Sequence, residues 1–122
     1  MKIWDLDTPA VVVDLDVVER NLARAAAYAA EHRLRLRPHT KTHKIPWFAR
    51  RQLVSGATGL TVAKVGEAGV MLRAQPPDLL LAYPLVGARK IARLIDVARH
   101  ALVTVAVDSL DVATPLAEAA RS

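Results

Sequence analysis

Residues 79–107, LLLAYPLVGARKIARLIDVARHALVTVAV, place a long amphipathic segment between two short apolar runs. Leu79–Tyr83 predicts a strand that is apolar enough to be covered on both faces. Ala88–His100 predicts a helix, because its apolar residues recur at helical spacing. These residues are Ile91, Leu94, Ile95 and Ala98. Leu102–Val107 predicts a second strand, so the stretch indicates two parallel strands joined by a right-handed crossover.

The same alternation extends toward the N-terminus. Leu34–Arg37, which Pro38 ends, and Gly59–Ala63 predict two earlier strands. Helices are expected from Pro46 to near Gly56 and from Gly66 to Ala74. We therefore expect four parallel strands in sequential order with helices outside. Doubly wound sheets and (β/α)₈ barrels both fit this order, but no Gly-x-Gly-x-x-Gly or Walker loop favours a nucleotide-binding Rossmann domain.

The two ends of the chain continue the pattern. Ala10–Val13 predicts a short strand, and Asp14 or Asp16 can cap the helix that follows. Three further sets of residues complete the expected elements: an apolar face of Val18, Leu22, Ala25, Ala26 and Ala29 on this helix, a buried stripe of Ile45, Phe48, Ala49 and Leu53 on the helix near Pro46, and Asp108 or Ser109 opening a last helix.

Composition limits the class of protein. Hydrophobic residues make up 52% of the 122 residues, so the chain can bury a core. It has no cysteine, which excludes a disulfide scaffold, a cysteine nucleophile and a thiolate metal site in these residues. The first residues lack the apolar stretch of a signal peptide, and no apolar run approaches the roughly 18 residues that span a membrane. We expect a cytoplasmic protein without a membrane partner.

Positive charge is concentrated in one part of the sequence. The formal net charge is +5, and residues 32–66 contain eight lysines and arginines but no acidic residue. Such a segment attracts anions, although it can equally be a solvated basic face. A phosphorylated small molecule is favoured over nucleic acid, because the segment has no aromatic interleaving and no nucleic-acid-binding motif.

The densest group of chemically active residues is Arg37-Pro-His-Thr-Lys-Thr-His-Lys44. It follows the carboxyl end of a predicted strand, which is where active sites of α/β proteins lie. Neighbouring cations disfavour the ammonium form of a lysine here, and a neutral amine can attack an aldehyde. An exposed basic loop is the alternative. His39 and His43 have metal-ligand spacing only on a helix, which Pro38 disfavours, so no metal site is predicted.

Several blocks of the sequence resemble one enzyme family. Leu36-Arg-Pro-His-Thr-Lys-Thr-His-Lys44 resembles the cofactor-lysine segment of the D-threonine aldolase and D-serine dehydratase family, pyridoxal-phosphate enzymes of the alanine racemase fold type. Blocks that resemble other parts of the family follow in family order and cover nearly the whole chain. They are Asp7–Asp16 with Glu19–Asn21, Thr61–Ala68, Leu80–Gly87 and Val105–Ser109.

The resemblance implies a fold. It implies that residues 1–122 are the N-terminal portion of a pyridoxal-phosphate-binding (β/α)₈ TIM-type barrel, which is incomplete in this chain. It also implies that residues 1–15 contain a strand belonging to an absent C-terminal β domain. By the same resemblance, the full-length protein is expected to be a homodimer.

The resemblance also implies site residues. Pyridoxal 5′-phosphate is expected as an aldimine on Lys41 and not on Lys44. Arg37, His39, His43, Thr61 and Tyr83 are expected to bind the cofactor or to line its pocket, while Glu67 is interpreted as a helix-start residue. A divalent metal of the Zn or Mn type is expected for the family, with ligands that lie outside this chain.

The implied reaction acts on a D-β-hydroxy amino acid. The first expectation is retro-aldol cleavage to glycine and an aldehyde, as in D-threonine aldolase. The alternative is elimination to an oxo acid and ammonia, as in D-serine dehydratase, which yields pyruvate. A truncated fragment that binds cofactor without catalysis is a third possibility. We expect the 122 residues alone to be inactive, because a barrel needs ~250 residues.

Overall fold

The computed structural model describes residues 2–121, and its centre is a three-stranded parallel sheet. The strands are β1 (Leu60–Val62), β2 (Asp78–Leu81) and β3 (Leu102–Val105), in the order β1-β2-β3. Thr61 pairs with Leu80, and Leu80 pairs with Thr104. The expected parallel strands near 59–63, 79–83 and 102–107 are therefore confirmed, in sequential order and with shorter bounds.

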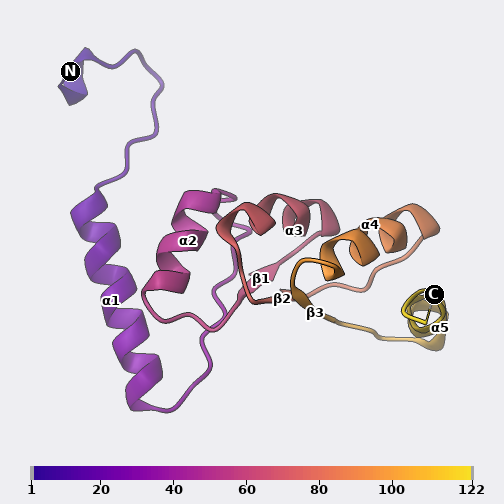
Figure 1. Ribbon diagram of the computed structural model, residues 1–122. Coiled ribbons are helices and arrows are strands. Elements are labelled where there is room, and N and C mark those ends of the chain that lie inside the picture. Colours follow the sequence, from indigo (N-terminus) through magenta and orange to yellow (C-terminus); the bar gives the residue numbers. More distant parts are fainter. Residues whose placement is uncertain (1, 122) are drawn as a thin grey trace.

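Helices connect and flank these strands (Figure 1). They are η1 (Ile3–Asp5), α1 (Leu15–Glu31), α2 (Pro46–Val54), α3 (Val65–Met71), η2 (Leu72–Ala74), α4 (Ala88–Ala98) and α5 (Leu110–Ala119). Asp14 caps α1 by accepting a 3.0 Å hydrogen bond from the Val17 N–H. Ser109 caps α5 in the same way through Val112. Local capping chemistry thus explains where these two helices begin.

Two expected apolar stripes are only partly correct. On α1 the buried or half-buried positions are Val18, Leu22, Ala26 and Ala29, whereas Ala25 is exposed. On α2 the side chains of Phe48, Ala49 and Leu53 are at least half-buried. Ile45 is 43% exposed, because it is the N-cap residue of α2 and lies outside the helical face.

The prediction of a strand at Leu34–Arg37 is wrong. This segment runs parallel to β1, and the carbonyls of Leu36 and Pro38 accept hydrogen bonds of 2.9 Å and 2.8 Å from the Thr58 and Thr61 N–H groups. Only one bridge forms, between His39 and Thr61. Pro38 has no N–H to donate, so the ladder cannot continue through it.

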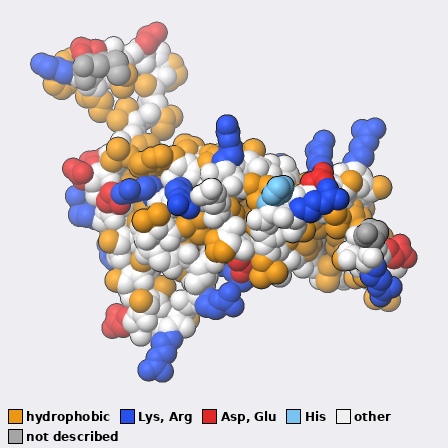
Figure 2. Space-filling model, viewed as in Figure 1, with side chains coloured by type: hydrophobic (Ala, Val, Ile, Leu, Met, Phe, Trp, Pro, Cys, Tyr) orange, Lys and Arg blue, Asp and Glu red, His pale blue; other side chains and the backbone are white. Residues whose placement is uncertain are grey.

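The segment at Ala10–Val13 also forms no strand within residues 2–121. Val11 is 97% exposed, and Val12 and Val13 are 52% and 45% exposed. Figures 1 and 2 show this part of the chain leading away from the body of the molecule to η1. A strand needs a hydrogen-bonded neighbour, and none lies beside this segment here. Its pairing with a second domain stays a prediction.

The two faces of the sheet have different surroundings. Leu60, Val62, Leu79 and Leu81 are 0–1% exposed and belong to one core cluster with residues of α2, α3 and α4. Figure 1 shows these three helices along one side of the strands. Because side chains alternate along a strand, Thr61, Leu80 and Thr104 point to the opposite face. Leu80 is half-buried and Thr104 is exposed, whereas Thr61 is buried, so this second face, called the uncovered face below, meets solvent at β2 and β3 but not at Thr61.

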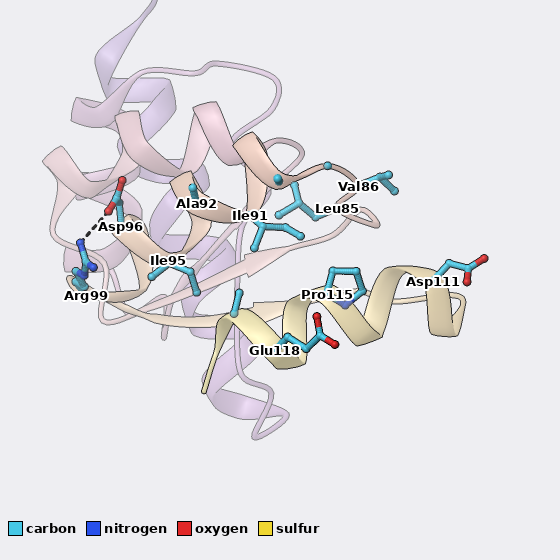
Figure 3. Close-up of a pocket in the computed structure, with 13 residues that line it drawn as sticks. Leu85, Val86, Ile91, Ala92, Ile95, Asp96, Arg99, Asp111, Pro115 and Glu118 are labelled. Carbon is cyan, nitrogen blue, oxygen red and sulfur yellow. Dashed lines mark hydrogen bonds and ion pairs between the residues drawn. The ribbon is translucent and has the colours of Figure 1, made fainter. Parts of the chain in front are cut away.

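The last helix packs loosely on α4. A cavity of about 650 Å³ lies between α4 and α5, with Ile91, Ile95 and Pro115 among its lining residues (Figure 3). None of residues 37–44 lines it, so this cavity is separate from the basic turn. No helix within residues 2–121 combines the length and hydrophobicity that a membrane span requires.

Candidate active site

The turn from Thr40 to Lys44 follows the segment that pairs with β1. The Lys44 N–H donates to the Thr40 carbonyl at 2.8 Å and closes the turn. The Thr40 side chain is fully buried, and both its N–H and its hydroxyl donate to the Thr61 carbonyl, at 2.9 Å and 3.2 Å. The turn is therefore fixed to β1 at its first residue, immediately before Lys41.

Lys41 lies at the carboxyl end of the sheet with an exposed side chain. Within residues 2–121 its ammonium group has no hydrogen-bond or ion-pair partner. Its backbone N–H donates to Nδ1 of His39 at 3.3 Å. Thus two residues of the expected site are in contact, and the Lys41 side chain is exposed and unpaired among the described residues.

The row of the sheet nearest Lys41 is formed by small side chains. The ladder continues past its paired residues, because the Ala82 N–H donates to Val62 and the Ala106 N–H donates to Leu81, both at 3.1 Å. Alternation places Ala63, Ala82 and Ala106 on the uncovered face, one row beyond Thr61, Leu80 and Thr104. Lys41 is not part of this row, because it lies in the turn that follows the bridge between His39 and Thr61. Methyl groups leave space on this face for a flat ligand.

Lys44 differs from Lys41 in having a carboxylate partner. Its Nζ lies 3.4 Å from Oε1 of Glu67, whose side chain is only 12% exposed. The other oxygen of Glu67 accepts a 2.9 Å hydrogen bond from the Ala63 N–H. Burial raises the pKa of Glu67, but the Ala63 hydrogen bond and Lys44 outweigh it, so the net pKa lies below the ordinary 4.5. Glu67 is thus a charged residue that joins α3 to the turn.

His43 supports the far end of the turn. Its Nδ1 accepts a 3.0 Å hydrogen bond from the Ile45 N–H, and its ring meets Phe48 edge-on with centroids 5.6 Å apart. Burial lowers the pKa of His43 below 6.5, although contacts with Gln52 and the Ile45 backbone act in the opposite direction. A neutral ring is needed for Nδ1 to accept, so the structure favours His43 as a support of the loop.

Arg37 points toward the opposite end of the sheet from Lys41. Its guanidinium forms an ion pair with Asp78, the first residue of β2, whose side chain is 6% exposed. Gly59 lies between them in the register, and a Cβ there would lie 2.6 Å from the Asp78 carbonyl oxygen. Asp78 begins β2, whereas Lys41 lies in the turn that follows the bridge between His39 and Thr61. The structure therefore does not bring Arg37 to the lysine.

Thr61 and Tyr83 occupy contrasting positions. Thr61 is 7% exposed, and its hydroxyl donates to the Arg37 carbonyl at 3.0 Å, beside His39 in the register. Tyr83 is 67% exposed and lines a cavity of about 790 Å³ that also includes Lys44 and Glu67. Lys41 does not line this cavity. The structure thus gathers His39, Lys41 and Thr61, and it places Tyr83 beside the turn's other lysine.

Sequence reasoning missed two residues that shape the site. Thr40 anchors the turn, and the alternation of Leu36, Pro38 and Thr40 on the helix-facing side could have indicated its burial. Asp78 neutralises Arg37 from a position 41 residues away. No local pattern identifies such a distant partner.

The acidic partners of the basic segment come from outside it. Asp78 pairs with Arg37 and lies 3.7 Å from Arg35, while Glu19 of α1 pairs with Arg51. Glu67 pairs with Lys44. Figure 2 shows Lys and Arg side chains spread over the visible face instead of gathered into one patch. Residues 2–121 contain no group of three or more His, Asp or Glu side chains placed to hold a metal ion.

Parallel strands in sequential order, helices on one face and a lysine turn at the carboxyl ends define the N-terminal part of an α/β barrel, which is incomplete in this chain. Residues 13–122 match the family described as alanine racemase, N-terminal domain. The chain belongs to this family and has the alanine racemase type of barrel fold.

Two curated enzymes are similar in sequence to this chain. The chain is 42% identical over 104 residues to a D-threonine aldolase of Arthrobacter sp., covering 85% of this chain and 27% of the relative. It is 42% identical over 84 residues to a D-threo-3-hydroxyaspartate dehydratase of Delftia sp. (strain HT23), covering 69% of this chain and 22% of the relative. The chain therefore spans about a quarter of the length of these relatives.

Solved structures agree with the sequence comparison. The D-threonine aldolase from Filomicrobium marinum superposes with a TM-score of 0.93 at 41% identity, covering 98% of this chain and 32% of that one. The dehydratase from Delftia sp. HT23 gives a TM-score of 0.84 at 35% identity, covering 95% and 31%. Nearly the whole chain is therefore similar to about a third of a D-threonine aldolase and of a D-threo-3-hydroxyaspartate dehydratase.

Proposed function

We propose that Lys41 is the residue through which the whole protein carries pyridoxal 5′-phosphate, in a lyase that acts on D-β-hydroxy amino acids. The observation that carries this proposal is the contrast within one turn. Lys41 has a free amine beside the uncovered sheet face, whereas Lys44 is paired with Glu67. The donor set fits the cofactor, because an aldehyde needs an unpaired primary amine.

The chain's own residues would position and orient the cofactor lysine. The buried Thr40 side chain and its two hydrogen bonds hold the turn against β1, and His39 Nδ1 accepts the Lys41 N–H. Lys41 Nζ must lose its proton before it can bond to carbon. When bound, pyridoxal phosphate would accept the electron pair that is left when a bond to the amino-bearing carbon of the substrate breaks. His39, Thr61 and Tyr83 remain proposed residues of the cofactor pocket. Arg37 and His43 are proposed to fix the segment that carries Lys41.

Retro-aldol cleavage of a D-threonine-like substrate is the reaction we favour, because two of the similar proteins above are D-threonine aldolases. Elimination is the second candidate, because a similar protein is a D-threo-3-hydroxyaspartate dehydratase. A mutant of that dehydratase was solved in a metal-free form. This supports a divalent metal in the whole protein, held by residues other than those described here.

The first test asks which lysine carries the cofactor. The chain is incubated with pyridoxal phosphate, reduced with borohydride and mapped by peptide mass spectrometry. Lys41→Ala should remove the major label and most of the visible absorbance of the bound cofactor. Lys44→Ala is the matched control and should retain both. Exchanged outcomes would reject the assignment of Lys41.

The second test concerns turnover. The whole protein should release glycine and an aldehyde from D-threonine, and dehydratase activity would instead release an oxo acid and ammonia. We expect the isolated 122-residue chain to attach the cofactor without turnover, because orienting the scissile bond contributes several kcal/mol and the relatives use far longer chains. Turnover by the isolated chain at the rate of a full-length relative would contradict this expectation.

A further inference from the structure

The turn contains two lysines three residues apart, and only one of them is proposed to carry the cofactor. Lys41 and Lys44 both lie just beyond the carboxyl end of the same segment, and both side chains reach solvent. A primary amine on either could attack an aldehyde. Exposure does not separate them, because the Lys44 side chain is 60% exposed. The difference between them must therefore come from what each amine contacts.

Glu67 is built to hold the amine of Lys44. One carboxylate oxygen is fixed by the Ala63 N–H at 2.9 Å, and the other lies 3.4 Å from Lys44 Nζ. Glu67 is in the first turn of α3, and that same hydrogen bond ties its side chain to Ala63, the residue that follows β1. The carboxylate is nearly buried, so water competes poorly for it.

The backbone of Lys44 adds a second reason for this contact. Lys44 has φ of +53°, a conformation that costs free energy for a residue with a side chain. Its N–H nevertheless closes the turn on Thr40 at 2.8 Å. An ion pair that anchors the Lys44 side chain stabilises this conformation and hence the position of Lys41 within the turn.

We propose that Glu67 is a positioning residue that selects Lys41 over Lys44 as the cofactor-bearing lysine, by holding Lys44 as a paired ammonium ion and by fixing the turn. This inference rests on the function proposed above. The lone pair of unprotonated Lys41 Nζ bonds to the aldehyde carbon. The aldehyde oxygen then leaves as water with two protons, both from the amine. The ion pair with Glu67 must break before the Lys44 amine can take this step, so Lys44 reacts more slowly than Lys41.

The test is Glu67→Gln, which keeps the size of the side chain and removes its charge. After pyridoxal phosphate and borohydride treatment, the ratio of Lys44 label to Lys41 label should rise about two- to fivefold, the range of partly exposed ion pairs. Asp96→Asn is the matched control, because Asp96 forms its ion pair with Arg99 on the surface of α4. It should leave the ratio unchanged.

A second measurement needs neither the cofactor nor a variant. Brief treatment of the unmodified chain with acetic anhydride reports how nucleophilic each amine is. Lys44 should react several-fold more slowly than Lys41. Equal rates would overturn the selection by Glu67, and this result stands even if Glu67→Gln fails to fold, which a urea melt would show.

The outcomes separate this inference from the proposed function. Absence of selective label on Lys41 in the unmodified chain rejects the proposed function. Selective label on Lys41 with an unchanged ratio in folded Glu67→Gln rejects the role of Glu67 alone. A purely structural role would lower the total label at both lysines and leave their ratio constant, so a constant ratio also counts against selection.

Discussion

The two faces of the sheet are formed by alternate residues of the same strands, yet they differ in what covers them and in what they can do. Leu79 is fully buried under the helices, while its neighbour Leu80 is half-buried on the other face. The covered face has an apolar core, whereas Arg37 and His39 lie beside the other face and Lys41 follows them in the turn. One face stabilises the fold, which allows the other to carry reactive groups.

The largest expected effect is the difference in stability between the variants Leu79→Ala and Leu80→Ala, which alter opposite faces of β2. Leu79→Ala should lower the free energy of unfolding by about 2–5 kcal/mol, because it empties a site in the core. Leu80→Ala should cost less than about 1.5 kcal/mol, since its side chain already meets solvent. Urea denaturation of both variants measures the difference. Equal losses would show that the second face is covered in solution.

The next largest effect concerns the row that holds Arg37 and Asp78. A methyl group at Gly59 would lie 2.6 Å from the Asp78 carbonyl and 2.9 Å from its Cβ. Gly59→Ala should therefore destabilise the chain by about 1–3 kcal/mol. Gly66→Ala is the matched control, because no atom lies within 4 Å of its Cβ position and alanine favours the helix. Its stability should stay equal or rise.

The smallest expected effect is a pH dependence of the stability that arises from His43 in the turn and not from the core. The pKa of His43 is lowered in the folded chain, so the unfolded chain binds more protons below its ordinary 6.5. The stability that His43 contributes is complete above pH 6.5 and is lost as pH falls below it. Urea midpoints at pH 7.5 and 5.5 should show a larger drop for the unmodified chain than for His43→Asn. The same drop in both would remove His43 as the cause.

Much of the fold could be predicted from periodicity, because an element that buries one face has apolar residues at a regular spacing in its own sequence. The strands around Leu60, Leu79 and Val103 and the helix from Ala88 follow directly from that pattern. The strand at Leu34–Arg37 failed for a reason the sequence contains, the missing N–H of Pro38. Local patterns alone overestimate pairing when a proline lies within the ladder.

The candidate site was less predictable than the fold. Lys41 was found from residue types and from resemblance to a family. The contacts that distinguish it from Lys44 involve Glu67, 23 positions after Lys44, and Arg37 is neutralised by Asp78 from another strand. Such ion pairs form only after the helices between the strands have folded and brought distant residues together. The sequence therefore shows which residues are charged but not which of them are paired.

The sequential strand order has a consequence for how the chain acquires its structure. Each described strand pairs only with the strand next to it in sequence, so the closures needed to form the sheet are short. On a ribosome, β1 and β2 can pair as soon as the helix between them has emerged, and β3 can join one unit later. The turn that contains Lys41 is synthesised before all three strands, so the sheet that positions this turn forms after it during translation.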